Sequence, residues 1–391
     1  MRRWLALLCA LIAVGGAAQA HLASDSYLRI EIGADGKLGG QWDIALRDLD
    51  VVVGLDANQD GAIAWGELRG KAREIEAYAF GRLRLAREGS NCRLVPAAMM
   101  VDYHAGSAYA VLPFAAECPL AGILTLQYRL LFDIDPSHRG LLTVAAGDRV
   151  SSEVLTPEHA EIVLDRGPGS LVDQAAQFLR FGFDHILLGY DHLLFIAVLL
   201  VTAALRRTGG AGWVAIDGLG RVLVDTIKTL TAFTLAHAIV LTPAVLGLVS
   251  VPARLVEPAV AVTIMLAALD NIWPILPRLR WQVAFAFGLI HGLSFAGALG
   301  PMRLPPLGLA IALGSFNLGV EAGQIALALL LVPIAFLMRH ESGYRRVVTP
   351  AVSLASLILA AAWFIDRVFA LDLLSLYSLS AAAMASRPTL S

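Results

Sequence analysis

Histidines and acidic residues recur inside long apolar stretches of the second half of the sequence. They are His185, Asp191, His192, His237, His291 and Glu321. An ionisable side chain in a bilayer is costly unless it is paired, buried against protein or bound to an ion. Imidazole and carboxylate are also the ligands that borderline divalent ions such as Ni²⁺, Co²⁺ or Zn²⁺ prefer. The sequence therefore predicts a shared metal or proton path within a membrane.

The spacing of the first three residues predicts how they are presented. His185 and His192 are seven residues apart, so on one continuous helix they lie two turns apart on the same face. Asp191 then points about 100° away and can orient a ligand or line a neighbouring wall. Taken singly, each histidine has a simpler interpretation, as a hydrogen-bonding residue that holds two helices together.

Other polar residues lie at helical spacing around this set. Asn317, Glu321 and Gln324 fall at i, i+4 and i+7, which is one stripe of a helix. His291 lies between Gly288 and Gly292, small residues that let helices approach closely. The predicted supporting residues are Thr234, Asp270, Asn271, Asn317 and Gln324.

The composition indicates a membrane protein. Of the 391 residues, 57% are hydrophobic and only 16% are charged, against roughly a quarter in soluble domains. The net charge of -2, without a basic stripe, argues against a nucleic-acid partner. We predict a polytopic α-helical membrane domain over 178–370, with six spans that each match ~30 Å of hydrocarbon. The spans are 183–205, 229–249, 255–276, 281–300, 307–337 and 347–368, and the apolar tail 371–391 follows them.

Targeting signals predict the orientation. Arg2 and Arg3 precede a short apolar run that ends in Ala18-Gln19-Ala20, the pattern of a signal peptide over residues 1–20. An uncleaved anchor is the alternative. Lys and Arg concentrate in alternate loops between the spans, which the positive-inside rule places in the cytoplasm. Both arguments predict a bacterial inner-membrane protein with its amino-terminal domain in the periplasm.

Residues 21–168 have the pattern of a mainly-β, sandwich-like domain with antiparallel strands. Apolar and polar residues alternate over 27–32, 38–46, 109–114, 124–132 and 141–145, with turn residues between them. Cys92 and Cys118 remain after the signal peptide leaves, and an oxidising compartment predicts a disulfide between them.

One segment of this domain, 56–67, has the pattern of an EF-hand calcium loop. The predicted ligands are Asp56, Asn58, Asp60, the backbone of Ala62, and Glu67. Gly61 permits the sharp turn, and 68–79 is the expected exiting helix. The alternative is a simple Asp-Gly turn. A single loop without a partner hand predicts a structural Ca²⁺ ion.

The predicted mature chain begins at His21, whose amine and imidazole can bind one metal ion. His104, His138 and His159 are candidates for further ligands of that ion. The simpler interpretation is that His21 only marks the cleavage position.

Several blocks of the second half resemble the HupE/UreJ family of membrane proteins over about 178–335. They are FDHILLGYDHLLF from Phe183, with its H-x5-D-H pattern, TAFTLAH from Thr231, FGLIHG from Phe287 and FNLGVEAGQ from Phe316. The resemblance implies a hydrogenase- or urease-accessory permease for nickel or cobalt, with partners in metalloenzyme maturation. It makes His185, Asp191 and His192 the leading ligands and His237, His291 and Glu321 the supporting ones. Two features differ from the family pattern: the long amino-terminal domain, and Asp270 where similar long members are expected to have Glu.

Three functions are compatible with these residues. The first is a metal-ion permease rather than an enzyme, in which His185 near the outer surface accepts the ion and His192 with Asp191 passes it inward. No Walker motif is present, so an ion gradient, the membrane potential or protons would drive it. The second is an intramembrane zinc hydrolase with Glu321 as base. The third is an accessory protein that binds a partner through its exported domain.

Overall fold

The computed structural model describes residues 24–369. Short segments within this range are excepted: 34–35, 59, 61, 105–106, 120–121, 137, 147–148, 165–170, 208–211, 250, 274, 277–279, 296–301 and 303. The predicted signal peptide, His21 and the tail 371–391 lie outside the described residues.

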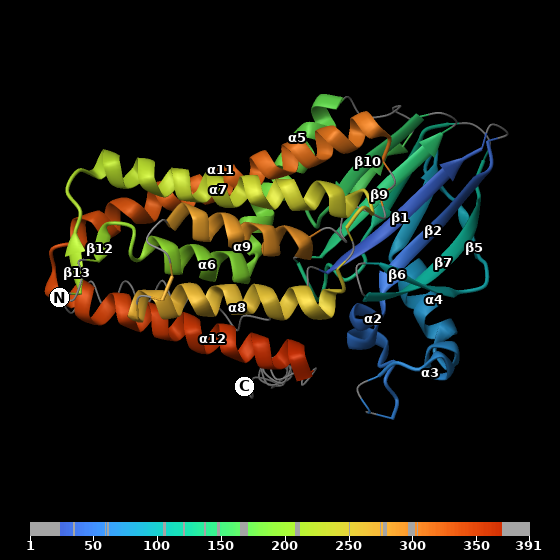
Figure 1. The fold of residues 1–391 in the computed structure, drawn as a ribbon. Helices are drawn as coiled ribbons and strands as arrows, with labels where there is room; N and C mark the ends of the chain where they lie inside the picture. The colour runs from blue at the N-terminus through green and yellow to red at the C-terminus, as the bar shows by residue number, and fades with distance from the viewer. Residues whose placement is uncertain are drawn as a thin grey trace, which may run out of the picture.

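Residues 24–164, here called the β domain, form two sheets (Figure 1). The larger sheet has the strand order β10-β9-β1-β2-β7-β5, with β6 also paired to β7, and the smaller has the order β11-β8-β3-β4. The strands are β1 Asp25–Ile32, β2 Leu38–Ala45, β3 Leu83–Arg87, β4 Ser90–Asn91, β5 Arg93–Pro96, β6 Met100–His104, β7 Ser107–Glu117, β8 Leu124–Tyr128, β9 Arg139–Ala146, β10 Arg149–Leu155 and β11 Glu161–Val163.

One hydrophobic core joins the two sheets. Leu28 and Trp42 of the larger sheet belong to the same buried cluster as Leu85 and Leu126 of the smaller one. Because successive side chains of a strand point to opposite faces, Tyr27 points the other way, into a cluster shared with the helices. The prediction of a mainly-β region is therefore confirmed, and its two sheets enclose a core as a sandwich does.

Two details of the predicted strands are wrong. β1 pairs with β9 in parallel, so the sheet is not wholly antiparallel, because these two strands come from opposite ends of the domain and are not joined by a hairpin. The strand predicted over 124–132 ends at Tyr128, because the chain leaves the sheet and turns at Leu131, whose φ is +58°.

The predicted calcium loop lies between helices. α2 (Leu46–Val53) precedes it, and α3 (Trp65–Gly70) and α4 (Ala72–Phe80) follow it in place of one exiting helix. The carboxylate of Glu67 accepts hydrogen bonds from the backbone N–H groups of Ala57, Asn58 and Ala64, at 3.1, 3.3 and 2.9 Å. The last loop residue thus folds back over the first ones. Gly61 lies outside the described residues.

Cys92 and Cys118 form the predicted disulfide, with their Cα atoms 4.4 Å apart. They lie next to Arg93 and Glu117, which are partners in the β5–β7 pairing. The bridge therefore joins two segments that the sheet already holds side by side.

Long helices make up the rest of the described chain. They are α5 Leu171–Leu188, α6 Tyr190–Leu200, α7 Leu219–Val245, α8 Ala253–Ile272, α9 Arg280–Ser294, α11 Pro306–Met338 and α12 Thr349–Phe369, the last preceded by the π-helical turn η3 Tyr344–Val348. Among the described residues, four segments are long and apolar enough to cross a membrane: Leu219–Val245, Arg254–Ile272, Pro306–Met338 and Tyr344–Phe369. The bent pair α5 and α6 gives a fifth if it is one span. The 15-residue helix α9 falls in the fourth predicted span, 281–300, and is shorter than that prediction.

The first predicted span is broken. α5 and α6 meet at Gly189 at an angle of 69°, so the expectation that His185 and His192 share one face of a continuous helix is wrong. A Cβ atom at Gly189 would lie 2.6 Å from the carbonyl oxygen of His185 and 2.9 Å from Nδ1 of His192. The break therefore depends on the missing side chain. His185 is also in the last turn of α5 and not in the first turn of a span, because the helix already begins at Leu171.

The β domain contacts the helices through α5. Gln174 donates to Oγ of Ser152 at 2.9 Å, and Gln177 donates to the carboxylate of Glu153 and accepts from the backbone N–H of Val154. The short hairpin of β12 (Leu205–Arg207) and β13 (Trp213–Ala215) lies at the opposite end of the bundle (Figure 1).

Candidate metal centre

Four helices bring one histidine each to the middle of the bundle. His185 comes from the last turn of α5, His192 from the first turn of α6, His237 from α7 and His291 from α9. His237 and His291 are fully buried and His192 is 3% exposed. The imidazole ring of His192 lies 4.6 Å from that of His185 and 5.5 Å from that of His291, measured between ring centroids.

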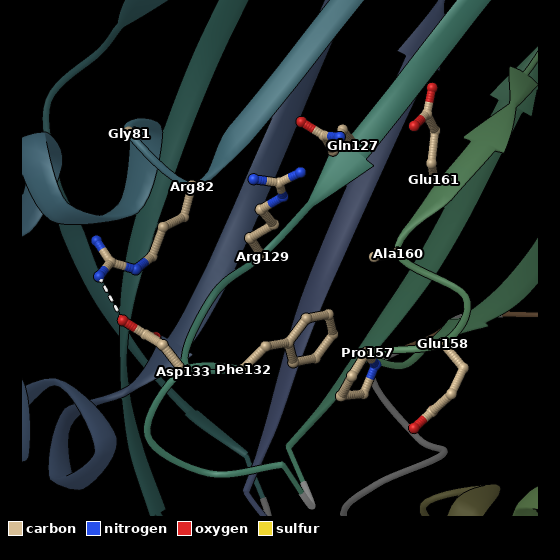
Figure 2. A pocket seen from close by; sticks show the side chains of 10 residues that line it. All are labelled: Gly81, Arg82, Gln127, Arg129, Phe132, Asp133, Pro157, Glu158, Ala160 and Glu161. Carbon is tan, nitrogen blue, oxygen red and sulfur yellow. Dashed lines mark hydrogen bonds and ion pairs between the residues drawn. The ribbon is translucent and has the colours of Figure 1, made fainter.

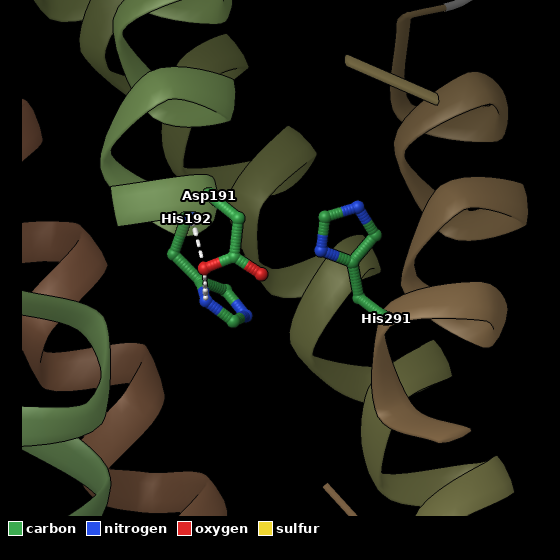
Figure 3. A group of neighbouring side chains, drawn as sticks. All are labelled: Asp191, His192 and His291. Carbon is green, nitrogen blue, oxygen red and sulfur yellow. Dashed lines mark hydrogen bonds and ion pairs between the residues drawn. The ribbon is translucent and has the colours of Figure 1, made fainter. Parts of the chain in front are cut away.

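Asp191 completes a compact group of possible ligands with His192 and His291. One ligand atom from each of the three lies within 4.8 Å of the others. Figure 3 shows Asp191 and His192 on one turn of α6, facing His291 across the space between α6 and α9. This is the kind of set that a divalent ion needs, with two nitrogens and one carboxylate oxygen.

Several nitrogens of the cluster are buried and, among the described residues, accept no hydrogen bond. They are Nε2 of His185, Nε2 of His192, Nε2 of His237 and Nδ1 of His291. Buried polar atoms are nearly always hydrogen-bonded in native proteins, and each exception needs an explanation. The lone pairs of these four nitrogens are therefore candidates to coordinate an ion.

Aromatic rings surround the imidazoles. Phe295 and Phe316 lie 4.5 and 5.4 Å from the ring of His185, and Phe195 and Phe233 lie 5.3 and 5.2 Å from that of His291. This apolar wall lowers the local dielectric, which strengthens the attraction between Asp191 and a cation.

Glycines bring the backbones of α7 and α9 together beside His291. A Cβ atom at Gly288 would lie 2.4 Å from the carbonyl oxygen of Phe233, and one at Gly292 would lie 2.6 Å from that of His237. The close approach expected of these glycines is therefore present, and it places His291 next to α7.

A line of polar contacts between α7 and α11 adjoins the histidines. Asn317 bonds to His237, Gln324 accepts from Thr234 at 3.1 Å, and Glu321 accepts from Thr231. The second carboxylate oxygen of Glu321 is buried and has no hydrogen-bond partner in the described structure. The predicted residues of these two helices thus lie together, with Glu321 outside the compact group of three.

Two predicted supporting residues lie at a different place. Asp270 accepts from the backbone N–H groups of Ile275 and Leu276, and Asn271 bonds to Thr202 and to the carbonyl of Val198. Thr263 of α8 lies 2.8 Å from Nε2 of His291, and Asn271 follows Thr263 by eight residues, which is about 12 Å along a helix. Asp270 therefore holds the turn that follows α8, and Asn271 fastens the end of α8 to Thr202 and Val198.

The structure shows the surroundings of His138 and His159, two of the candidate ligands for an ion at His21. His138 is fully buried, with Nδ1 2.6 Å from Oγ of Ser24 and Nε2 2.6 Å from the hydroxyl of Tyr128. Neither ring nitrogen is free for a metal, so His138 is not a ligand. Burial lowers the pKa of His138 to about 3, so the ring is neutral. Nε2 of His159 lies 3.7 Å from the carboxylate of Glu153.

A cavity of about 720 Å³ lies in the β domain, beside the smaller sheet (Figure 2). Its lining mixes charges of both signs, with Arg129 between the ion pair of Arg82 and Asp133 on one side and Glu161 on the other. It lacks the convergent set of ligands that the bundle has.

One residue of the centre was not predicted from the sequence. Thr263 of α8 is 1% exposed, and its hydroxyl lies 2.8 Å from Nε2 of His291. Its only signal in the sequence is a single hydroxyl in an apolar helix, which is common and carries no pattern.

One comparison with known proteins identifies the family of this chain. No curated protein matches the chain. A family model described as HupE / UreJ protein matches residues 160–367, a range that contains Asp191 and all four histidines of the cluster. This match covers more than half of the chain, and with the apolar helices it fits a metal-related membrane protein. The chain belongs to the HupE/UreJ family.

Proposed function

We propose that this protein is a permease for a divalent transition-metal ion of the nickel or cobalt type. One observation carries the proposal: inside an apolar helical bundle, His192 and His291, each with a buried nitrogen that has no hydrogen-bond partner in the described structure, form a compact group with Asp191. His185, which also has such a nitrogen, lies beside His192. A purely structural role would use both ring nitrogens in hydrogen bonds, whereas His237 and His291 each bond to another helix through one nitrogen and leave the other without a partner in the described structure. A cation entering this cluster exchanges its water ligands for nitrogen and carboxylate, so it need not enter hydrocarbon with its charge uncompensated.

The polar line between α7 and α11 supports a route for the ion. The contacts His237–Asn317, Thr234–Gln324 and Thr231–Glu321 link the same two helices. The carboxylate of Glu321, with one buried oxygen free of hydrogen bonds in the described structure, offers a second stop for a cation after the histidines. The ion would pass from the histidine cluster along this line.

The proposal includes six spans in a bacterial inner membrane, with the β domain in the periplasm. Its support is the distribution of charge. Arg207 and Arg280 donate to backbone carbonyls near the β12–β13 hairpin, at the end of the bundle away from the β domain (Figure 1). Cytoplasmic loops carry an excess of such residues.

Substitution of His192 tests the transport proposal. His192→Ala removes one ligand of the compact group, and we expect at least a tenfold loss of Ni²⁺ or Co²⁺ accumulation in cells or proteoliposomes. His340→Ala is the matched control, because His340 is 63% exposed and lies outside the cluster. Accumulation by His192→Ala equal to that of His340→Ala would contradict the proposal and favour an accessory role.

We also propose that the loop 56–67 binds a structural Ca²⁺ ion. The support is the helix–loop–helix arrangement and the position of Glu67 over the start of the loop. Calcium should raise the thermal unfolding midpoint of the wild-type protein, and Glu67→Gln should abolish most of that shift, because a bidentate carboxylate is lost. An equal shift for both proteins would contradict the assignment.

A further inference from the structure

We propose that Thr263 is a positioning residue that fixes the tautomer of His291 and thereby presents its Nδ1 lone pair to the ion. The inference rests on the proposed metal-binding function of the histidine cluster. It concerns a residue of α8 that itself offers no ligand to the compact group of Asp191, His192 and His291.

The hydrogen bonds of Thr263 have a defined direction. Its hydroxyl lies 2.6 Å from the carbonyl oxygen of Val260, which can only accept, so the single hydroxyl hydrogen is donated there. Toward His291, at 2.8 Å, Oγ1 is therefore left as an acceptor. A neutral imidazole has one N–H group and one lone pair. The N–H of His291 is thus on Nε2, and the lone pair is on Nδ1.

The direction of these bonds assigns the lone pair of His291 to Nδ1, and Nδ1 is also the ring nitrogen without a hydrogen-bond partner in the described structure. Nδ1 of His291 is buried and accepts no hydrogen bond within the described structure. If Thr263 donated to His291 instead, the N–H would be on Nδ1 and would point into the ligand group, where it would repel a cation.

In two other histidines of the cluster a hydrogen-bond partner also fixes the tautomer, but there the N–H is on Nδ1 and the lone pair is on Nε2. Nδ1 of His192 donates to the carboxylate of Asp191 at 3.0 Å, which leaves the lone pair on Nε2. Nδ1 of His237 donates to Oδ1 of Asn317 at 3.1 Å, and the amide of Asn317 is oriented by its own donation to the carbonyl of Leu313. In each ring the lone pair assigned by the partner is the unpartnered buried nitrogen.

Three different side chains thus set three tautomers so that every lone pair remains available. Partners of this kind orient metal-binding histidines, and their loss typically lowers metal affinity by 10- to 100-fold. The same arrangement is not needed for packing, because a valine has nearly the shape of a threonine. The structure therefore assigns Thr263 to the ion site on chemical grounds.

Matched variants of the full-length protein in detergent test this assignment. Thr263→Val keeps the shape and removes the acceptor, whereas Thr263→Ser keeps the hydroxyl. Thr226→Val is the control, because Thr226 is also buried and, within the described structure, its hydroxyl bonds only to the carbonyl of Val222 in its own helix. Co²⁺ serves as the probe, with affinity from calorimetry and the ligand set from its visible absorption spectrum.

We expect Thr263→Val to bind Co²⁺ about 10- to 100-fold more weakly, with a changed spectrum. Thr263→Ser should stay within about threefold of wild type, and Thr226→Val should match wild type. Wild-type affinity and spectrum in Thr263→Val, or an equal loss in Thr263→Ser, would overturn the inference.

A measurement without metal separates this inference from the proposed function. In protein with ¹⁵N-labelled histidine, the signal that disappears in His291→Gln should have the shifts of an Nε2–H tautomer, and Thr263→Val should alter them. An Nδ1–H tautomer in wild type would refute the role of Thr263. Absence of Co²⁺ binding to wild type, with the expected tautomer, would instead refute the metal site.

Discussion

A directional chain of hydrogen bonds runs through the core of the β domain. Trp42 donates to Ser26 at 3.2 Å, Ser26 to Tyr128 at 2.6 Å, Tyr128 to His138 at 2.6 Å, His138 to Ser24 at 2.6 Å, and Ser24 to Asp48 at 2.9 Å. The direction follows from the two ends, because an indole N–H only donates and a carboxylate only accepts. His138 is the one histidine in this series of hydrogen bonds. Its ring must be neutral, because one nitrogen donates to Ser24 while the other accepts from Tyr128.

Asp25, next to this chain, makes the stability of the β domain depend on pH. Burial raises the pKa of Asp25 from 3.8 to about 7. The folded state therefore keeps this proton at pH values where the unfolded chain has lost it. The protonated Asp25 contributes fully to the free energy of unfolding below about pH 4. This contribution is lost as the pH rises toward 7, and the loss is at most about 4 kcal/mol.

We expect Asp25→Asn to stabilise the β domain at pH 8 but not at pH 4. The local free energy of opening of β1 can be measured by hydrogen exchange, corrected for the intrinsic rate at each pH. Glu31→Gln is the control, because Glu31 is exposed on the same strand. Equal effects of Asp25→Asn at both pH values would contradict the assigned cause.

The site residues could be predicted where residue type was itself the signal. An ionisable group in an apolar stretch stands out, and His192, His237 and His291 do lie in one cluster. Thr263 could not be found this way, because its role depends on which atom of a neighbouring helix its hydroxyl meets. Asn271 shows that a polar residue in a predicted span can also fasten the end of a helix.

At the scale of elements, the crossing of α5 and α11 depends on two glycines. A Cβ atom at Gly319 would lie 2.0 Å from the carbonyl oxygen of Leu179, and one at Gly182 would lie 2.0 Å from that of Phe316. Each glycine thus faces the backbone of the other helix. The contact places His185, three residues after Gly182, against the ring of Phe316.

Gly319→Ala should therefore separate α5 from α11 and destabilise the bundle by about 1–3 kcal/mol. The control is Gly314→Ala on the same helix, where a Cβ atom meets nothing within 4 Å. This change should be neutral or stabilising by up to about 1 kcal/mol, because alanine favours helix. Thermal unfolding in detergent measures the stability of both variants. Equal unfolding midpoints for Gly319→Ala and Gly314→Ala would contradict the role of Gly319 in the crossing of α5 and α11.

The elements were predictable to the extent that hydropathy marks them. The long apolar helices occur near their predicted positions, although α7 begins at Leu219 and not at 229. The break at Gly189 was missed because 183–205 is one apolar run, and a single glycine within it has no distinctive pattern. His185 and His192 meet because the chain bends, and not because they share a helical face.

At the scale of the whole molecule, the two ends of the bundle differ. The β domain lies at one end, and the β12–β13 hairpin lies at the other (Figure 1). Arg345 donates to the carbonyl of Trp213 in this hairpin.

The parallel pairing of β1 with β9 could not be predicted from local sequence patterns, because it joins segments far apart in sequence.

Reporter fusions test the proposed orientation and number of spans. Alkaline phosphatase is active only outside the cytoplasm, so fusions after Leu164 and Leu248 should be active and one after Gly343 inactive. Green fluorescent protein should give the reverse pattern. Phosphatase activity after Gly343 would contradict the six-span arrangement.

The attachment of α5 has a mechanical consequence. One end of this 18-residue helix, about 27 Å long, is held by β10 through Gln174 and Gln177, and the other end carries His185. The helix α5 thus connects the larger sheet to His185 of the histidine cluster, and the chain bends at Gly189 directly after it. A change in the position of β10 would therefore be transmitted along this helix to the His185 imidazole.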